Sequence, residues 1–204
     1  MDSPPLTLRR IGAQEAADPA AAQRLAGQLA DVLIDCVAGG ASVSFMQPLP
    51  RERALAFWQQ VLAATALSHR VLMVAEQQGR VVGTVQAVLD LPDNQPHRAD
   101  VAKMLVHRSA RRQGLAARLL AALEAQALAE GRPVLVLDTV TGGDAERLYQ
   151  RAGWQRVGEV PLYALMPDGR PCGTTFYFKH LATPSFAASA AASQGACTFT
   201  SLSK

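Results

Sequence analysis

One stretch decides the fold of this chain: VAKMLVHRSARRQGLAARLLAALEAQALA, from Val101 to Ala129. An apolar segment passes through a basic turn to Gly114 and then directly into a helix of alanine and leucine. That helix has no acidic residue before Glu124. The start of a helix can hold a phosphate or pyrophosphate when its backbone N–H groups are free, positive charge is near and no side chain blocks the approach. The stretch therefore predicts a strand, a loop and a helix that bind an anionic ligand.

Length and charge narrow the class of ligand. The chain has 204 residues, which fits one domain with a single core, and 49% of them are hydrophobic, as in soluble globular proteins. A net charge of +3 is too small for a nucleic-acid binder, and the arginines gather around the basic turn. We therefore expect a small anionic ligand and no nucleic acid as partner.

Cysteines and apolar runs bear on metal binding and location. Cys36, Cys172 and Cys197 are odd in number, and their spacings match neither a metal site nor a disulfide framework, which is typical of a reducing cytosol. The N-terminus has no apolar signal core, and no run approaches the roughly 18 apolar residues of a membrane span. We expect a cytoplasmic protein without a metal and without a membrane partner.

Hydrophobic periodicity predicts a mixed α/β order of elements. Helices are expected at 19–37, 51–67, 115–129 and 144–151, and strands at 6–11, 70–75, 80–89, 100–106, 134–137, 155–161 and 174–180. The composition changes to Ala, Ser and Thr after residue 181. The prediction is one three-layer α/β/α domain over residues 1–181, with the anion loop at the carboxyl end of a central strand, and a tail over 182–204 outside the core.

Three kinds of phosphate-binding loop are candidates for residues 111–116. A nucleoside-triphosphatase loop needs Gly-Lys-Ser/Thr, but Gly114 is followed by Leu115. A dinucleotide fold needs GxGxxG early in the chain, whereas this loop lies in the middle and holds one glycine. The third kind fits: Arg111 to Ala116, RRQGLA, matches the Q/R-x-x-G-x-G/A loop of the GNAT family of N-acetyltransferases, which holds the pyrophosphate of acetyl-CoA.

A second motif, farther along the chain, supports this resemblance. Ala145 to Tyr149 (AERLY), followed by Gly153-Trp154, resembles the A-x-x-L-Y-x-x-x-G-F/W signature of the same family. The order of the two motifs and their separation also match, and the resemblance covers most of residues 1–181. Gly142 departs from the family, in which an asparagine often stands at this place.

The resemblance implies a fold and a way to hold acetyl-CoA. The implied sheet is mixed and mostly antiparallel, with a splayed pair of central parallel strands. The pantetheine arm would pair with the backbone of the strand before the loop, at Met104, Leu105 and Val106. The pyrophosphate would lie on the loop and first helical turn, that is, on Arg111, Arg112, Gln113, Gly114, Leu115 and Ala116, with backbone N–H groups from Arg112 onward and the guanidinium groups as donors.

The resemblance also implies catalytic residues. Tyr149 matches the tyrosine that lies near the cofactor sulfur and can give a proton to the leaving thiolate. An alkyl amine with a pKa near 10.4 is mostly protonated at neutral pH, so a base must help. Asp100, at the start of the central strand, and Asp138, at the end of the next, are two candidates for that base. The irregular stretch with Ser44, Phe45 and Met46 is expected to close over the acceptor.

The predicted activity is transfer of acetyl from acetyl-CoA to an amine, or a related nucleophile, of a small molecule by direct attack in a ternary complex. Blocks at 39–46, 100–116, 137–149 and 156–181 resemble the tabtoxin-resistance branch of the family, which implies a toxin or antibiotic as acceptor and detoxification as the effect. Two alternatives remain open at this point: acetylation of protein N-termini or lysines, and a catalytically idle acetyl-CoA-binding module with a regulatory partner.

Overall fold

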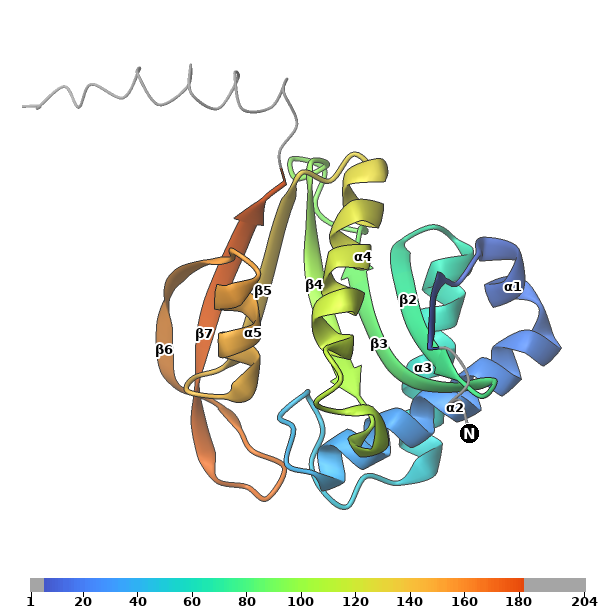
Figure 1. The fold of residues 1–204 in the computed structure, drawn as a ribbon, viewed down its shortest axis with the longest axis horizontal. Coiled ribbons are helices and arrows are strands. Elements are labelled where there is room, and N and C mark those ends of the chain that lie inside the picture. The colour runs from blue at the N-terminus through green and yellow to red at the C-terminus, as the bar shows by residue number, and fades with distance from the viewer. Residues whose placement is uncertain (1–5, 182–204) are drawn as a thin grey trace, which may run out of the picture.

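A single seven-stranded sheet forms the centre of the computed structural model, which describes residues 6–181 (Figure 1). The strand order is β1-β2-β3-β4-β5-β7-β6, and each neighbouring pair is antiparallel except β4 with β5. The mixed, mostly antiparallel sheet expected from the sequence is therefore confirmed.

The predicted elements occur in the predicted order, and the short helices α1 and η1 occur in addition to them. The strands are β1 (Thr7–Arg10), β2 (Arg70–Gln77), β3 (Arg80–Val88), β4 (Arg98–Val106), β5 (Val134–Val140), β6 (Gln155–Leu165) and β7 (Pro171–His180). The helices are α1 (Ala13–Ala17), α2 (Pro19–Ala38), α3 (Arg51–Ala66), α4 (Leu115–Ala129) and α5 (Asp144–Arg151), with a short 3-10 helix, η1 (Arg108–Ala110).

The sheet separates two hydrophobic cores, so the molecule has three layers. Adjacent strand residues point to opposite faces. Leu72 of β2 therefore joins α1, α2 and α3 in one core, whereas Met73 joins the core that α4 covers. Trp58 of α3 and Leu119 of α4, both fully buried, lie on opposite sides of the sheet.

The only parallel pair in the described sheet separates soon after it begins. β4 and β5 pair through Arg98–Asp100 and Val134–Val136, but β4 continues to Val106 and β5 to Val140 without pairing to each other. The two strands thus leave an open slot between them beyond Asp100 and Val136. Backbone N–H and C=O groups along this slot need other partners. The splayed central strands are therefore confirmed, and the slot ends at the basic turn before α4.

Several boundaries differ from the sequence-based expectation. The end predicted for β5 at residue 137 was wrong, because the polar Asp138 stands inside the strand, paired with Phe176 of β7. Asp100 is likewise the third residue of its strand. β6 continues past Pro161 through a register shift between Val160 and Ala164; a proline is tolerated at an edge bulge, where no ladder donor is needed.

Some expectations concern parts beyond the described residues. The predicted tail, 182–204, and Cys197 within it lie outside them. Between residues 6 and 181, no helix combines the length and apolar character needed to cross a bilayer. The same residues contain no group of three or more His, Cys, Asp or Glu side chains placed to hold a metal ion.

Candidate active site

The loop before α4 has the backbone that an anion site requires. Gly114 precedes the helix with a φ of 71°, and Arg112 has a φ of 61°, so both are left-handed. A Cβ at Gly114 would meet no atom within 4 Å, and the loop is exposed. Packing therefore does not require this glycine; its backbone conformation and the open approach to the helix N-terminus do.

The arginines of the loop divide into two groups. Arg108 is engaged by Asp35 through its backbone nitrogen (2.9 Å) and its guanidinium, and Arg111 Nε donates to the Val106 carbonyl at 3.0 Å. By contrast, Arg112 and Arg118 are exposed, and their guanidinium groups make no hydrogen bond or ion pair with any described residue. These two are the guanidinium groups that remain available to a phosphate.

The predicted pantetheine contacts lie along the splayed part of β4. Leu105 is buried in the core of α2 and α3, so only its backbone can reach a ligand. Leu115 is likewise buried, on the α4 side. The Val106 carbonyl accepts from both Arg111 and the Cys36 thiol, the latter at 3.5 Å, which occupies its two lone pairs.

Tyr149 lies on α5 with its ring packed and its hydroxyl free of described partners. The residue is 5% exposed, and its ring centroid lies 5.7 Å from that of Trp154 and 6.1 Å from that of Tyr177. Burial, reinforced by the negative charge of Asp138, raises the pKa of Tyr149 to about 12. The phenol is therefore neutral near pH 7 and carries a proton that it can donate.

A polar network fixes α5 against β7. Glu146 accepts a hydrogen bond from the Gly142 nitrogen at 2.5 Å and from the Tyr177 hydroxyl at 3.0 Å, and Gln150 donates to that hydroxyl at 3.2 Å. Sequence reasoning missed this network, because Tyr177 and α5 are far apart along the chain. It holds the helix that carries the candidate acid.

The two predicted carboxylates have different surroundings. Asp100 forms an ion pair with Arg98 of its own strand, and its side chain is 42% exposed. Asp138 is exposed and forms no ion pair with a described residue, yet its charge acts on both Tyr149 and Lys103. The charge of Asp138 thus contributes to the raised pKa of Tyr149, with burial as the larger cause.

Lys103 is the residue of this site that sequence reasoning missed. Its ammonium donates to Ser44 Oγ at 3.2 Å and lies 5.4 Å from the ring centroid of Phe57 and 6.0 Å from that of Phe45. The sequence signal that could have identified it is a single lysine within the apolar segment VAKMLV. Of the three predicted acceptor residues, Ser44 and Phe45 thus contact β4, whereas Met46 is exposed.

The loop at 41–50 also reaches the β6–β7 hairpin, as Figure 1 shows. Ser42 Oγ donates to the Leu165 carbonyl at 2.8 Å, and the Gln47 nitrogen donates to the Pro167 carbonyl at 3.0 Å. Two segments far apart in the sequence are joined in this way. The joined segments lie beside Lys103 of β4, which contacts the loop through Ser44.

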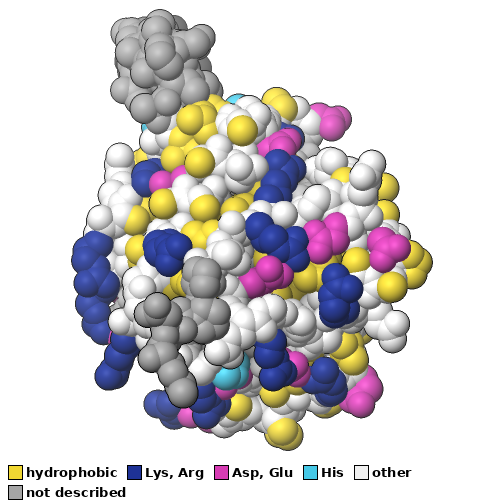
Figure 2. All heavy atoms as spheres, turned by 45° about the vertical axis from the view of Figure 1, so that its right-hand side comes forward, with side chains coloured by type: hydrophobic (Ala, Val, Ile, Leu, Met, Phe, Trp, Pro, Cys, Tyr) yellow, Lys and Arg dark blue, Asp and Glu magenta, His cyan; other side chains and the backbone are white. Residues whose placement is uncertain are grey.

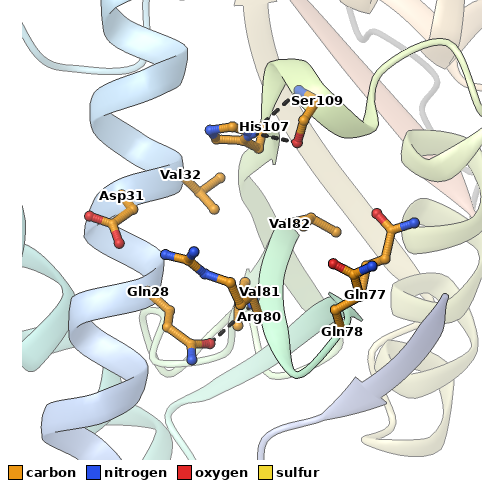
Figure 3. Close-up of a pocket in the computed structure, with 10 residues that line it drawn as sticks. All are labelled: Gln28, Asp31, Val32, Gln77, Gln78, Arg80, Val81, Val82, His107 and Ser109. Carbon is orange, nitrogen blue, oxygen red and sulfur yellow. Dashed lines mark hydrogen bonds between the residues drawn. The ribbon is translucent and has the colours of Figure 1, made fainter. Parts of the chain in front are cut away.

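A separate cavity lies between α2 and the turn of the β2–β3 hairpin (Figure 3). Its volume is about 270 Å³, and its wall includes Asp31, Arg80, His107 and Ser109. The Gln28 side chain accepts from the Val81 nitrogen at 3.0 Å and joins helix to hairpin. None of the predicted catalytic or acetyl-CoA residues lines this cavity.

The face that Figure 2 shows carries arginine and lysine side chains beside acidic ones. Several ion pairs join segments that are far apart in the sequence. Arg9 binds Glu15 at 2.7 Å and Glu76 at 2.8 Å, and Arg10 binds Glu130 at 2.6 Å. These paired arginines contrast with Arg112 and Arg118 at the start of α4, whose guanidinium groups form no ion pair with a described residue.

Comparison with known proteins gives a family and a fold. The sequence profile of the Acetyltransferase (GNAT) family matches residues 34–154. An uncharacterized N-acetyltransferase encoded between hisH and hisA in Azospirillum brasilense is 35% identical over 112 residues, which cover 54% of this chain and 65% of that relative. The match therefore spans less than two thirds of the relative's length.

Solved structures share the fold at low identity. The yncA protein of Salmonella typhimurium, whose structure contains its cofactor acetyl-CoA, is 20% identical with a TM-score of 0.68, over 88% of this chain and 95% of that one. The ribosomal-protein-alanine N-acetyltransferase of Brucella melitensis is 22% identical with a TM-score of 0.68, over 86% and 99%. The arrangement of strands, loop and helix described above is thus that of known acetyltransferase structures.

Proposed function

Because the chain belongs to the acetyltransferase (GNAT) family, we propose that it transfers the acetyl group of acetyl-CoA to an amine of a small molecule in the cytoplasm. The observation that carries the proposal is the slot between β4 and β5, which ends at the basic, glycine-started α4. A long ligand with an anionic end and a reactive end suits such a slot.

The residues at the start of α4 suit the pyrophosphate of acetyl-CoA. Gly114 leaves the N-terminal N–H groups of the helix open, and no acidic residue stands in its first turn. Arg112 and Arg118 are unpaired within the described chain and supply the positive charge. The unpaired backbone of β4 would hold the pantetheine arm by strand-like hydrogen bonds.

The proposed chemistry is direct attack within a ternary complex. The nitrogen of the amine forms a bond to the thioester carbonyl carbon, and the carbon–sulfur bond breaks. The nitrogen loses a proton to Asp138, directly or through a water, and the thiolate takes the proton of Tyr149. We assign the base to Asp138 because it acts electrostatically on Tyr149, whereas Asp100 is held by Arg98.

The proposed acceptor is a small molecule, such as an amino-acid-like toxin or antibiotic, with detoxification as the effect. Resemblance to the tabtoxin-resistance branch suggests the class. The loop at 41–50 supports a small acceptor, because Ser42 and Gln47 tie it to the β6–β7 hairpin and narrow the approach that a peptide would need.

Acetyl-CoA turnover against an amine library, measured as free-thiol appearance, tests the proposal. We expect thiol release with a subset of small amines and an acetylated product of matching mass. Initial rates with both substrates varied should give intersecting lines, since direct attack forms no acetyl-enzyme. Turnover confined to peptides would instead assign a protein acetyltransferase, and no turnover with any amine would leave an acetyl-CoA-binding module.

A further inference from the structure

Lys103 stands at a bulge in β4. Thr84 pairs with Leu105 and Gln86 with Ala102, so Lys103 and Met104 together face Val85 of β3. The lysine has a φ of 53°, a left-handed conformation that is costly for a residue with a side chain. Bulges redirect side chains, and strain of this kind persists where the surrounding structure fixes it. The bulge turns a lysine out of an otherwise regular strand.

The ammonium of Lys103 is held without a carboxylate. Ser44 Oγ accepts from it at 3.2 Å, and the rings of Phe57 and Phe45 lie beside it. A second cation, the guanidinium of Arg53, lies over the ring of Phe45, 5.7 Å from its centroid. No described aspartate or glutamate is in ion-pair contact with Lys103. Burial lowers the pKa of the ammonium, which the charge of Asp138 partly opposes.

Lys103 and Asp138 carry opposite charges and form no ion pair with each other. The charge of Asp138 raises the pKa of Lys103 and that of Tyr149, and Asp138 forms a hydrogen bond with neither. A zwitterionic molecule complements such a pair, with its amine toward Asp138 and its anionic group toward Lys103. The amine would then lie on the side of the proton donor, where the acetyl group arrives.

We propose that Lys103 determines acceptor specificity by binding a carboxylate that the acceptor carries close to its reactive amine. The inference rests on the proposed acetyl transfer and adds to it a residue and a chemical class of acceptor. Ser44 orients the ammonium by its hydrogen bond, and the two phenylalanine rings exclude water from the flanks of the lysine chain. A partly desolvated cation gains more from a carboxylate than an exposed one does.

The test compares each of the common L-amino acids with its own carboxamide as acceptor. A carboxamide lowers the pKa of the neighbouring amine and so presents more of the reactive neutral form, so amine basicity cannot produce a preference for the acid. We expect kcat/KM to favour the acid, and Lys103→Met to reduce that ratio by about tenfold or more, mainly through KM, as for loss of a hydrogen bond to a charged group. Lys103→Arg should restore part of the ratio.

Binding measured apart from turnover separates this inference from the proposed function. Calorimetric titration of the same amino acids into the protein saturated with coenzyme A should give weaker binding to Lys103→Met. Equal use of acid and carboxamide by the wild type, or an equal loss for both in Lys103→Met, would overturn the role of Lys103. Absence of thiol release with every acceptor would instead overturn acetyl transfer.

Discussion

Tyr149 shows how one side chain can serve packing and chemistry together. Its ring packs against those of Trp154 and Tyr177, while its hydroxyl forms no hydrogen bond with a described residue. A phenol with a pKa near 12 keeps its proton throughout the physiological range. The group is therefore in its acid form when the carbon–sulfur bond breaks, as donation of a proton to the thiolate requires.

Tyr149→Phe should keep the ring and lose the proton. We expect kcat to fall by about 10²-fold or more, the usual contribution of a general acid, with the Kd for acetyl-CoA nearly unchanged. The pKa is raised, so the acid form is present below about pH 12 and is lost only above it. With an acceptor that lacks a carboxylate, the wild-type pH profile should therefore show no alkaline fall up to about pH 10. Unchanged turnover in the variant would remove Tyr149 from the mechanism.

The two carboxylates offer a matched pair of substitutions. Asp138→Asn should lower kcat/KM by about 10²-fold, because the acceptor amine loses its base, and Asp100→Asn should have a much smaller effect. Asp100→Asn instead frees Arg98 from a partly exposed ion pair, which contributes about 1 kcal/mol to stability. Steady-state kinetics and thermal unfolding of both variants decide the matter. The reverse order of rates would assign the base to Asp100.

Among the elements, α4 carries a built-in control. It has a left-handed glycine next to each end: Gly114 with a φ of 71° and Gly131 with a φ of 72°. An added Cβ would meet nothing within 4 Å at either position. The two glycines therefore differ in one respect, which is that only Gly114 lies at the N-terminal end where N–H groups are free.

Alanine at the two positions should separate strain from ligand binding. Each substitution should destabilise the fold by about 1–2 kcal/mol, the cost of a left-handed residue with a side chain. Gly114→Ala should also raise the KM for acetyl-CoA by about tenfold, because the methyl group keeps the pyrophosphate from the N–H groups. Gly131→Ala should leave that KM unchanged. Equal KM values for the two variants would exclude the loop as the pyrophosphate site.

At the level of the whole molecule, the proposed slot is bounded by segments that unfolding would separate. β4, β5 and α4 meet at it, and the loop at 41–50 and the β6–β7 hairpin join beside it. A ligand that spans the slot therefore binds the folded chain alone. Its binding free energy adds to the free energy of unfolding.

Coenzyme A should raise the thermal unfolding midpoint. At a concentration 100 times its Kd, the added stability is about 2.7 kcal/mol, which corresponds to roughly 5–10 °C for a chain of this size. Scanning calorimetry over a series of coenzyme concentrations gives the shift, and Gly114→Ala should show a smaller one at equal concentration. A midpoint independent of coenzyme A would contradict binding in the slot.

The sequence alone determined the seven strands and four of the five α-helices of the described chain, and the kind of donor. Helix periodicity, the apolar strands and the RRQGLA loop depend on neighbours along the chain, and local steric and hydrogen-bonding rules act over such distances. Boundaries failed where a partner strand decided them: Asp138 stays in β5 because β7 pairs with it, and Pro161 stays in β6 because that strand lies at the edge.

Only the tertiary structure decided which side chains meet. Asp100 and Asp138 were equal candidates in the sequence, and they differ in the fold: Asp100 forms an ion pair with Arg98, whereas the charge of Asp138 raises the pKa of Tyr149. Lys103 became a candidate site residue only in the fold, because it lies at the bulge opposite Val85 and donates a hydrogen bond to Ser44, 59 positions away. Electrostatic and packing contacts depend on distance in space, and the chain brings these residues together only when the sheet has formed.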